Sequence, residues 1–119
     1  MALRDKLRER VQPMLQPGDQ IRHVWMTQSG MSPYSPIGGL IGALIRKYWV
    51  VAATDRELVV MKASLWMPSK PKNVAFSVPR TRLNPDGKLW AKIQLGNDTH
   101  YLHRRFFDDV RAQDAELGG

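Results

Sequence analysis

Two residue pairs in this chain have types and spacing that could do chemistry. His100 and His103 are three residues apart, a spacing at which two imidazoles on a helix could share a metal ion. On a strand, the same odd spacing places them on opposite faces. Because the surrounding pattern predicts a strand, we expect no metal site. Asp108 and Asp109 are adjacent and point about 100° apart on a helix, so we expect helix-N-terminal acids that favour the dipole rather than a catalytic pair.

The chain shows no other recognisable catalytic motif. Gly38-Gly39 lacks the Lys-Ser/Thr that follows in a phosphate-binding loop. No nucleophile motif surrounds any serine. The absence of cysteine excludes disulfides and thiol catalysis. We therefore expect a protein that is not an enzyme and that holds no cofactor.

The segment 29–42 is the most unusual part of the sequence. It runs S-G-M-S-P-Y-S-P-I-G-G-L-I-G, with prolines and glycines that oppose a settled strand. Apolar residues continue to Ile45, and two cations follow at once. This order is expected of a membrane-surface contact, in which the apolar tip enters the acyl boundary and the cations meet anionic headgroups. The alternative is a loop that folds back as a core plug or a contact between copies. The candidate membrane or partner contacts are Tyr34, Ile37, Leu40, Ile41, Leu44 and Ile45, and the candidate headgroup or anion-binding residues are Arg46 and Lys47.

Charge is unevenly spread along the 119 residues, whose formal net charge is +7. Residues 41–72 carry six basic and two acidic groups, whereas residues 98–116 carry three and five. A basic protein of this kind prefers a phosphate-rich surface, either lipid or nucleic acid, unless the charge only keeps the surface solvated. The residues that would suit single-stranded nucleic acid are the cations Arg80, Arg82, Lys88 and Lys92 near Trp66 and Trp90.

Length and termini indicate where such a protein would reside. The chain has the size of one domain. Its N-terminus is charged and lacks the apolar run of a signal peptide, so we expect cytoplasmic residence, with peripheral attachment to the inner face of the membrane. The longest apolar run, residues 37–45, is far shorter than the roughly 20 residues that cross a bilayer.

Period-two patterns predict a mostly β protein around a central hairpin, Lys47 to Lys62, with a turn at Asp55. Apolar residues of both parities in this hairpin require both of its faces to be covered. Asp55 is expected to stabilise the turn by bonding its own backbone. An Asp-Gly hairpin turn is expected within 84–87. The other predicted strands are residues 20–28, 74–78, 80–83, 89–95 and 99–103.

Helical patterns appear at both ends of the chain. Leu3, Leu7 and Val11 recur at helical spacing in residues 2–15, and Pro13 should end or kink that helix. We expect it to pack on the domain, with a membrane-interfacial role as the alternative. Residues 104–117 form an amphipathic pattern, with Phe106 among the apolar residues, and should cover the mouth of the strand set.

Two segments resemble bacterial pleckstrin-homology-like (PH-like) domains. Residues 50–60, V-V-A-A-T-D-R-E-L-V-V, resemble the hairpin of the second and third strands. Residues 101–110, Y-L-H-R-R-F-F-D-D-V, resemble the last strand entering the closing helix. The resemblance implies a barrel or sandwich of about seven antiparallel strands capped by one helix at 18–117, after an N-terminal amphipathic helix and turn at 1–17. It also implies a binding module rather than an enzyme.

Three functions fit these observations. The first is a peripheral membrane-surface or membrane-protein adaptor that acts through the 36–45 loop and the adjacent basic residues. The second is a protein-interaction or homo-oligomerisation domain in which the same loop packs on a partner chain. The third, which the apolar loop favours less, is a basic nucleic-acid-binding module.

Overall fold

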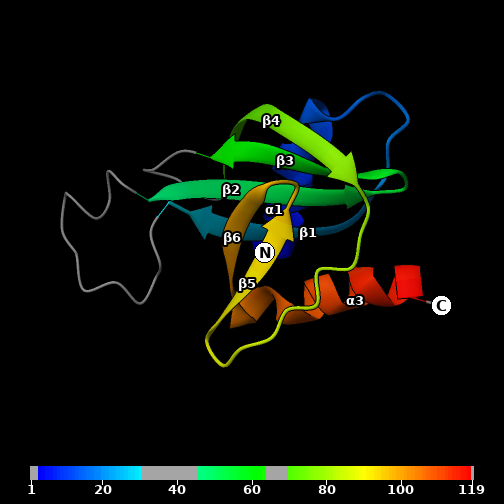
Figure 1. Cartoon of the computed structure of the whole chain (residues 1–119). Helices are drawn as coiled ribbons and strands as arrows, with labels where there is room; N and C mark the ends of the chain where they lie inside the picture. Colours follow the sequence, from blue (N-terminus) through cyan, green and yellow to red (C-terminus); the bar gives the residue numbers. More distant parts are fainter. Residues whose placement is uncertain (1–2, 31–45, 64–69, 119) are drawn as a thin grey trace.

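The computed structural model describes residues 3–30, 46–63 and 70–118 (Figure 1). It is mostly β, with six antiparallel strands in one open sheet, a short N-terminal helix and a C-terminal helix. The predicted fold class is therefore confirmed. The strand order is β4-β3-β2-β1-β6-β5, which leaves β4 and β5 as the two edges. The elements are α1 (Leu3–Val11), η1 (Gln12–Met14), β1 (Ile21–Ser29), β2 (Lys47–Thr54), β3 (Glu57–Ala63), β4 (Pro71–Pro79), β5 (Trp90–Leu95), β6 (Asp98–His103), η2 (Arg104–Phe106) and α3 (Phe107–Gly118).

The central hairpin of β2 and β3 forms as predicted, with Ala52 opposite Val59 in the antiparallel register. Its turn is held by a different residue from the expected one. The Thr54 hydroxyl oxygen accepts the backbone N–H groups of Arg56 and Glu57, at 3.3 and 3.2 Å. Asp55 instead pairs with the Arg22 guanidinium. A threonine hydroxyl can satisfy a turn in the same way as an aspartate carboxylate, which frees Asp55 for the ion pair.

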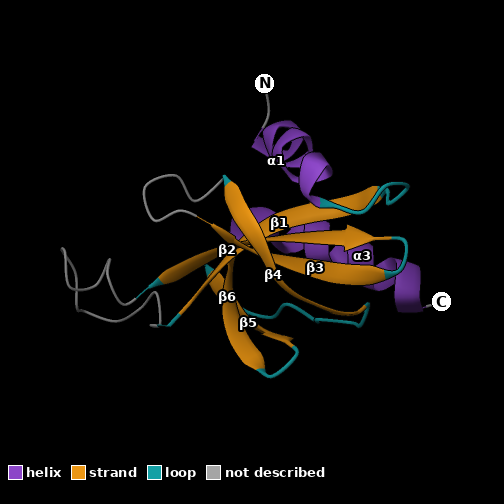
Figure 2. Cartoon of the chain, turned by 90° about the horizontal axis from the view of Figure 1, so that it is seen from above, coloured by secondary structure: helices purple, strands orange, loops and turns teal. Residues whose placement is uncertain are grey.

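Both faces of the four-stranded part, β1 to β4, are covered (Figure 2). The β5–β6 hairpin crosses one face, which we call the inner face, and α1 lies on the other, the outer face. Thr27 marks the inner face, because its hydroxyl lies 2.7 Å from His100 of β6. Neighbouring residues of β1 alternate, so Met26 and Gln28 belong to the outer face. The two-sided apolar pattern of the hairpin is explained by these two layers.

The N-terminal helix packs on the sheet, as the favoured interpretation predicted. Leu7 and Val11 are fully buried and belong to the common hydrophobic core. Arg8 donates hydrogen bonds from its guanidinium to the carbonyls of Ile21 and Arg22, at 3.1 and 2.9 Å. The α-helix ends at Val11, and Pro13 lies in the 3₁₀ turn that follows, which agrees with the expected effect of that proline.

The predicted strand at residues 80–83 is wrong, and the described residues form six strands, where about seven were expected. The reason is a competing set of hydrogen bonds. The Asp114 carboxylate of α3 accepts the backbone N–H groups of Leu83 and Asn84, at 2.8 and 2.7 Å. Gln113 donates to the Thr81 carbonyl at 3.3 Å. Backbone groups that bond to the helix cannot also form a ladder with a neighbouring strand.

The hairpin turn predicted at 84–87 is wrong: these residues form no turn and join no pair of strands, and the chain bends only at residues 88 and 89. Asn84 adopts a positive φ of 47°, a region that asparagine tolerates better than most residues. At Gly87 the chain approaches itself closely: an added Cβ would lie 2.1 Å from the carbonyl oxygen of Trp90. The Asp-Gly pair therefore precedes the bend that leads into β5 and does not form a hairpin.

The C-terminal elements close the molecule as predicted. Phe106 and Phe107 are both buried, and Val110 is fully buried. Asp109 accepts a hydrogen bond at 2.8 Å from Arg4 of α1, so the two helices are joined across the fold. The expected location of Asp108 and Asp109 in the first turn of a helix is confirmed.

Candidate functional site

The predicted contact residues of the apolar loop lie outside the described residues, so their exposure stays a prediction. The structure does define where this connection begins and ends. Ser29 of β1 pairs with Lys47 of β2, so the loop leaves and re-enters at one end of the sheet. The connection 64–69 springs from the same end, because Ala63 pairs with Pro71. The predicted contacts concerned are Tyr34, Ile37, Leu40, Ile41, Leu44 and Ile45.

Five cations stand at the roots of these two connections, and we call this region the basic end. Four are exposed lysines, and the fifth is a half-buried arginine. Within the described ranges, none of the five lies within ion-pairing distance of a carboxylate. The sequence explains this, since it has no acidic residue in 30–54 or in 58–85. The five cations are Arg46, Lys47, Lys62, Lys70 and Lys72.

Arg46 has an unusual environment within the basic end. Its Nε is buried and has no hydrogen-bond acceptor among the residues that the structure describes. Leaving a buried donor unpaired costs about 1–3 kcal/mol, and more for a charged group. An anionic oxygen that reached this nitrogen would recover that free energy. Of the two predicted anion-binding residues, Arg46 therefore has an N–H group at Nε that could donate to an anion, and Lys47 has an exposed charge.

Ion pairs gather at the opposite end of the sheet, where β1 begins and β2 turns into β3. Arg56 donates to Asp19 at 2.6 Å. Glu116 of α3 lies 2.8 Å from His23 and 2.9 Å from Arg80. Hydrogen bonds from His23 and then Arg80 lower the pKa of Glu116 below its usual value. The molecule thus has one end whose charges are neutralised in pairs and one end whose cations are not.

One of the cations considered for nucleic-acid binding, Arg80, is engaged within the fold. The Arg80 side chain is only 9% exposed and is held by Glu116, with a second hydrogen bond to Gln113 at 3.2 Å. Trp66 lies outside the described residues. Trp90 packs edge-on against His103, with ring centroids 5.0 Å apart. Arg80 in particular is committed to holding α3.

The two histidines of β6 lie on opposite faces, as predicted. His100 points to the inner face and is fully buried, with Nδ1 on the Thr27 hydroxyl. Its Nε2 has no hydrogen-bond partner within the described ranges. Burial lowers the pKa of His100 to about 4. Beside it, the Trp49 indole donates to the Ser29 hydroxyl at 2.7 Å. These side chains form a buried polar row near the basic end, and they leave His100 neutral at ordinary pH.

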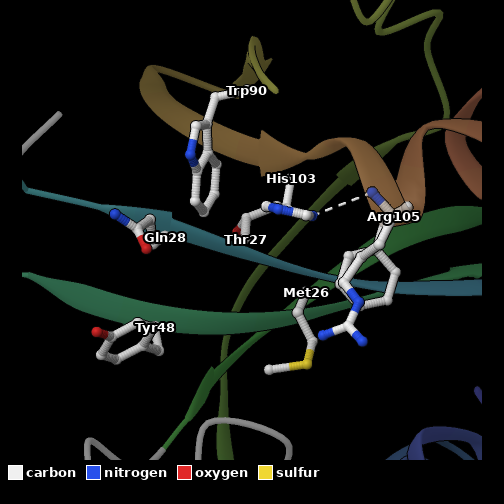
Figure 3. Close-up of a pocket in the computed structure, with 8 residues that line it drawn as sticks. Met26, Thr27, Gln28, Tyr48, Trp90, His103 and Arg105 are labelled. Atoms are coloured by element: carbon white, nitrogen blue, oxygen red, sulfur yellow. Dashed lines mark hydrogen bonds between the residues drawn. The ribbon is translucent and has the colours of Figure 1, made fainter. Parts of the chain in front are cut away.

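A pocket that the sequence analysis missed opens on the outer face, and we call it the outer pocket (Figure 3). Its volume is about 260 Å³. Trp90 and His103 project from β5 and β6 toward β1, while Tyr48 is supplied by β2. The register explains the grouping, since Tyr101 of β6 pairs with Gln28 of β1. The lining residues are Met26, Thr27, Gln28, Tyr48, Trp90, His103, Arg105 and Phe106.

Hydrogen bonding orients the imidazole in this pocket. His103 Nδ1 accepts the backbone N–H of Arg105 at 3.1 Å, which leaves the proton of the neutral ring on Nε2. Burial and then the nearby charges of Arg105 and Arg104 lower the pKa of His103. One signal could have revealed the pocket: Trp90 occupies the polar face of a strand whose other members there are Lys92 and Gln94.

Comparisons with protein-family models, with curated proteins and with solved structures find no match to this chain. Among the described residues, no helix has the length and apolar character needed to cross a bilayer. In the same part of the chain, no group of three or more His, Asp or Glu residues is arranged to hold a metal ion.

Proposed function

We propose that this chain is a non-enzymatic, PH-like binding module that attaches to an anionic membrane surface through the 36–45 loop, Arg46 and Lys47. The observation that carries the proposal is the basic end. Five cations without an acidic partner among the described residues surround the roots of the apolar loop. The order of elements, a strand set closed by one C-terminal helix, supports the PH-like assignment.

The electrostatic part of the proposal follows from where charge is neutralised. A basic residue close to an anionic leaflet contributes about 1 kcal/mol to binding. Lys47, Lys62 and Lys72 are exposed and lie on adjacent strands at one end, so they can approach a flat surface together. The ion pairs at the far end, such as Arg56 with Asp19, add little net charge there. Attraction by the leaflet would therefore orient the molecule with its basic end toward the membrane.

The apolar part rests on the composition of the two connections at that end. Residues 37–45 read I-G-G-L-I-G-A-L-I, and residues 64–69 read S-L-W-M-P-S. Both are rooted in paired strands, since Ser29 pairs with Lys47 and Ala63 with Pro71. Apolar side chains that enter the acyl boundary add to the attraction of nearby cations. Charge alone would give weak, salt-sensitive binding, whereas the combination gives attachment that outlasts moderate salt.

Co-sedimentation with vesicles tests the proposal. The full chain is mixed with phosphatidylcholine vesicles, with or without about one third phosphatidylglycerol, and we expect it to pellet only with the anionic ones. Leu40→Asp should reduce the bound fraction severalfold, because a carboxylate cannot enter the acyl boundary. The matched control is Leu117→Asp, which places the same change on an exposed apolar residue of α3. Equal binding by the two variants would remove the loop as the anchor.

Two other results would favour the competing functions. A stable dimer of the wild-type chain in lipid-free solution, dissociated by Leu40→Asp, would assign the loop to homo-oligomerisation. Binding of single-stranded nucleic acid that survives moderate salt would point to the third function, because purely electrostatic binding falls steeply with salt. Either result together with no anionic-vesicle binding would replace the membrane proposal.

A further inference from the structure

We propose that the outer pocket is a binding site for a small aromatic carboxylic acid, whose ring lies against Trp90 and Met26 and whose carboxylate meets Arg105. This site is separate from the basic end, and it does not depend on membrane attachment. The inference rests on the shape of the pocket, on the kinds of side chain that line it, and on the balance of hydrogen-bond donors and acceptors around it.

The shape of the pocket limits the size of the ligand. Its volume of about 260 Å³ lies just below the range of roughly 300–1,000 Å³ that is typical of sites for drug-sized ligands. Three separate parts of the fold wall it in: β1 with β2, the β5–β6 hairpin, and η2. A body of one or two fused rings suits such a space, whereas an extended chain would need a groove open at both ends.

The walls favour a flat apolar body. Met26, Trp90 and Phe106 supply a thioether and two aromatic rings. Trp90 already meets the imidazole of His103 edge-on, at a centroid distance of 5.0 Å and an interplanar angle of 85°. Aromatic rings gain about 0.5–1.5 kcal/mol from such offset or edge-on partners beyond area burial. A second ring beside Trp90 would make the same kind of contact.

The polar groups favour an anion. The lining includes a guanidinium and no carboxylate. Within the described part of the chain, the Arg105 guanidinium forms no ion pair, and its one described contact is a cation–π contact at 5.8 Å from the Phe106 ring. His103 presents Nε2–H as a further donor, because its Nδ1 is occupied by the Arg105 backbone. A planar carboxylate matches the fork of an arginine better than a single-point acceptor does.

Solution NMR on the lipid-free chain tests the site, with the indole N–H signal of Trp90 as the reporter, assigned by its loss in Trp90→Phe. The probes are 2-naphthoate, its neutral amide 2-naphthamide, and inorganic phosphate. We expect naphthoate to shift the Trp90 signal saturably and naphthamide to bind about tenfold more weakly, since a hydrogen bond to a charged group is the stronger kind. Phosphate alone should leave the signal unchanged.

Two arginine variants decide whether Arg105 receives the carboxylate. Arg105→Gln should weaken naphthoate binding about tenfold while leaving the weak naphthamide binding unchanged. Arg111→Gln is the matched control, since Arg111 also lies over a phenylalanine ring, at 5.3 Å from Phe107, and is not a lining residue. Equal affinity of acid and amide, equal effects of the two variants, or a Trp90 response to phosphate would each overturn the proposal. The lipid-free assay is independent of vesicle binding.

Discussion

His100 is a buried imidazole with one satisfied nitrogen. Its Nδ1 lies 2.7 Å from the Thr27 hydroxyl, and its Nε2 has no hydrogen-bond partner in the part of the chain that the structure describes. Burial holds its pKa at about 4, against an ordinary value of 6.5. The folded chain therefore binds a proton at His100 less readily than the unfolded chain does. The stability that follows from this difference is fully present above pH 6.5 and is lost as the pH falls toward 4.

The expected loss is roughly 3 kcal/mol of unfolding free energy between pH 6.5 and 4, because each pKa unit corresponds to about 1.36 kcal/mol. Urea unfolding at a series of pH values measures it. The double variant Thr27→Val with His100→Leu removes both hydrogen-bonding partners and should flatten the profile in this window. His103→Asn, on the opposite face of the same strand, should keep most of the acid sensitivity. An unchanged acid loss in the double variant would contradict this account.

The segment between β4 and β5 was predicted to contain a strand, but it is instead hydrogen-bonded to α3, and we call it the tether. The backbone N–H groups of Leu83 and Asn84 donate to the carboxylate of Asp114, a residue that is 6% exposed. The same carboxylate accepts a hydrogen bond from the Gln113 side chain at 2.8 Å. These bonds attach the chain to α3 along its approach to β5. The helix consequently holds the connection from β4 to β5 in addition to covering the core.

Asp114→Ala should lower the unfolding free energy by about 2–4 kcal/mol, because it leaves the Leu83 N–H buried without its charged acceptor. Chemical denaturation measures the change. Asp108→Ala is the control on the same helix: its side chain is 95% exposed, so we expect a change within about 0.5 kcal/mol. A similar effect from both substitutions would mean that the tether contributes little.

The N-terminal helix provides a second test at the scale of an element. If α1 packs on the sheet in solution, Leu7→Ala should destabilise the chain by about 2–5 kcal/mol, as expected for a fully buried leucine. Lys6→Ala, one residue away and exposed, should change stability by less than about 0.5 kcal/mol. A negligible cost for Leu7→Ala would show that the helix detaches, which would reopen its membrane-interfacial interpretation.

At the scale of the whole molecule, charge is separated between the two ends of the sheet. The end that carries Arg22, Arg56 and Arg80 neutralises them with Asp55, Asp19 and Glu116. The basic end has no such partners in the described ranges. Exposed charges act over about 8–10 Å at physiological salt, so an anionic surface that approached the basic end would meet its cations together. This arrangement would give binding a preferred orientation.

Two double charge reversals that change the net charge equally, at different places, test whether the position of the charge matters. Lys62→Glu with Lys72→Glu should weaken binding to anionic vesicles by more than tenfold, since each cation contributes about 1 kcal/mol. Lys6→Glu with Arg111→Glu changes the net charge equally, and we expect a much smaller loss. Raising the salt from about 50 to 300 mM should narrow the difference between the pairs, because screening weakens exposed charges. Equal losses at low salt would mean that total charge, and not the basic end, sets the affinity.

Local patterns determined most of the secondary structure of this chain by themselves. Burial on one face produces the alternation in β5 and the helical spacing of Leu7 and Val11. Burial on both faces produces the continuous apolar strands of the central hairpin, and each pattern can be recognised from neighbouring residues alone. Pro13 ended its helix for a reason that is local to its own ring. The burial of Phe106 and Phe107 also followed from the face they share with Val110.

The tertiary structure decided what depends on residues that are distant in sequence. Residues 80–83 have a strand pattern, yet they form no strand, because Asp114, about thirty residues later, accepts the backbone N–H groups of Leu83 and Asn84. The outer pocket joins Met26 and Tyr48 to Trp90 and Arg105 only because β6 pairs with β1. The basic end likewise exists because antiparallel pairing brings the start of β2, the end of β3 and the start of β4 to the same end of the sheet. Periodicity along the chain reports which face a side chain occupies, whereas the choice of neighbour requires the pairing of whole strands.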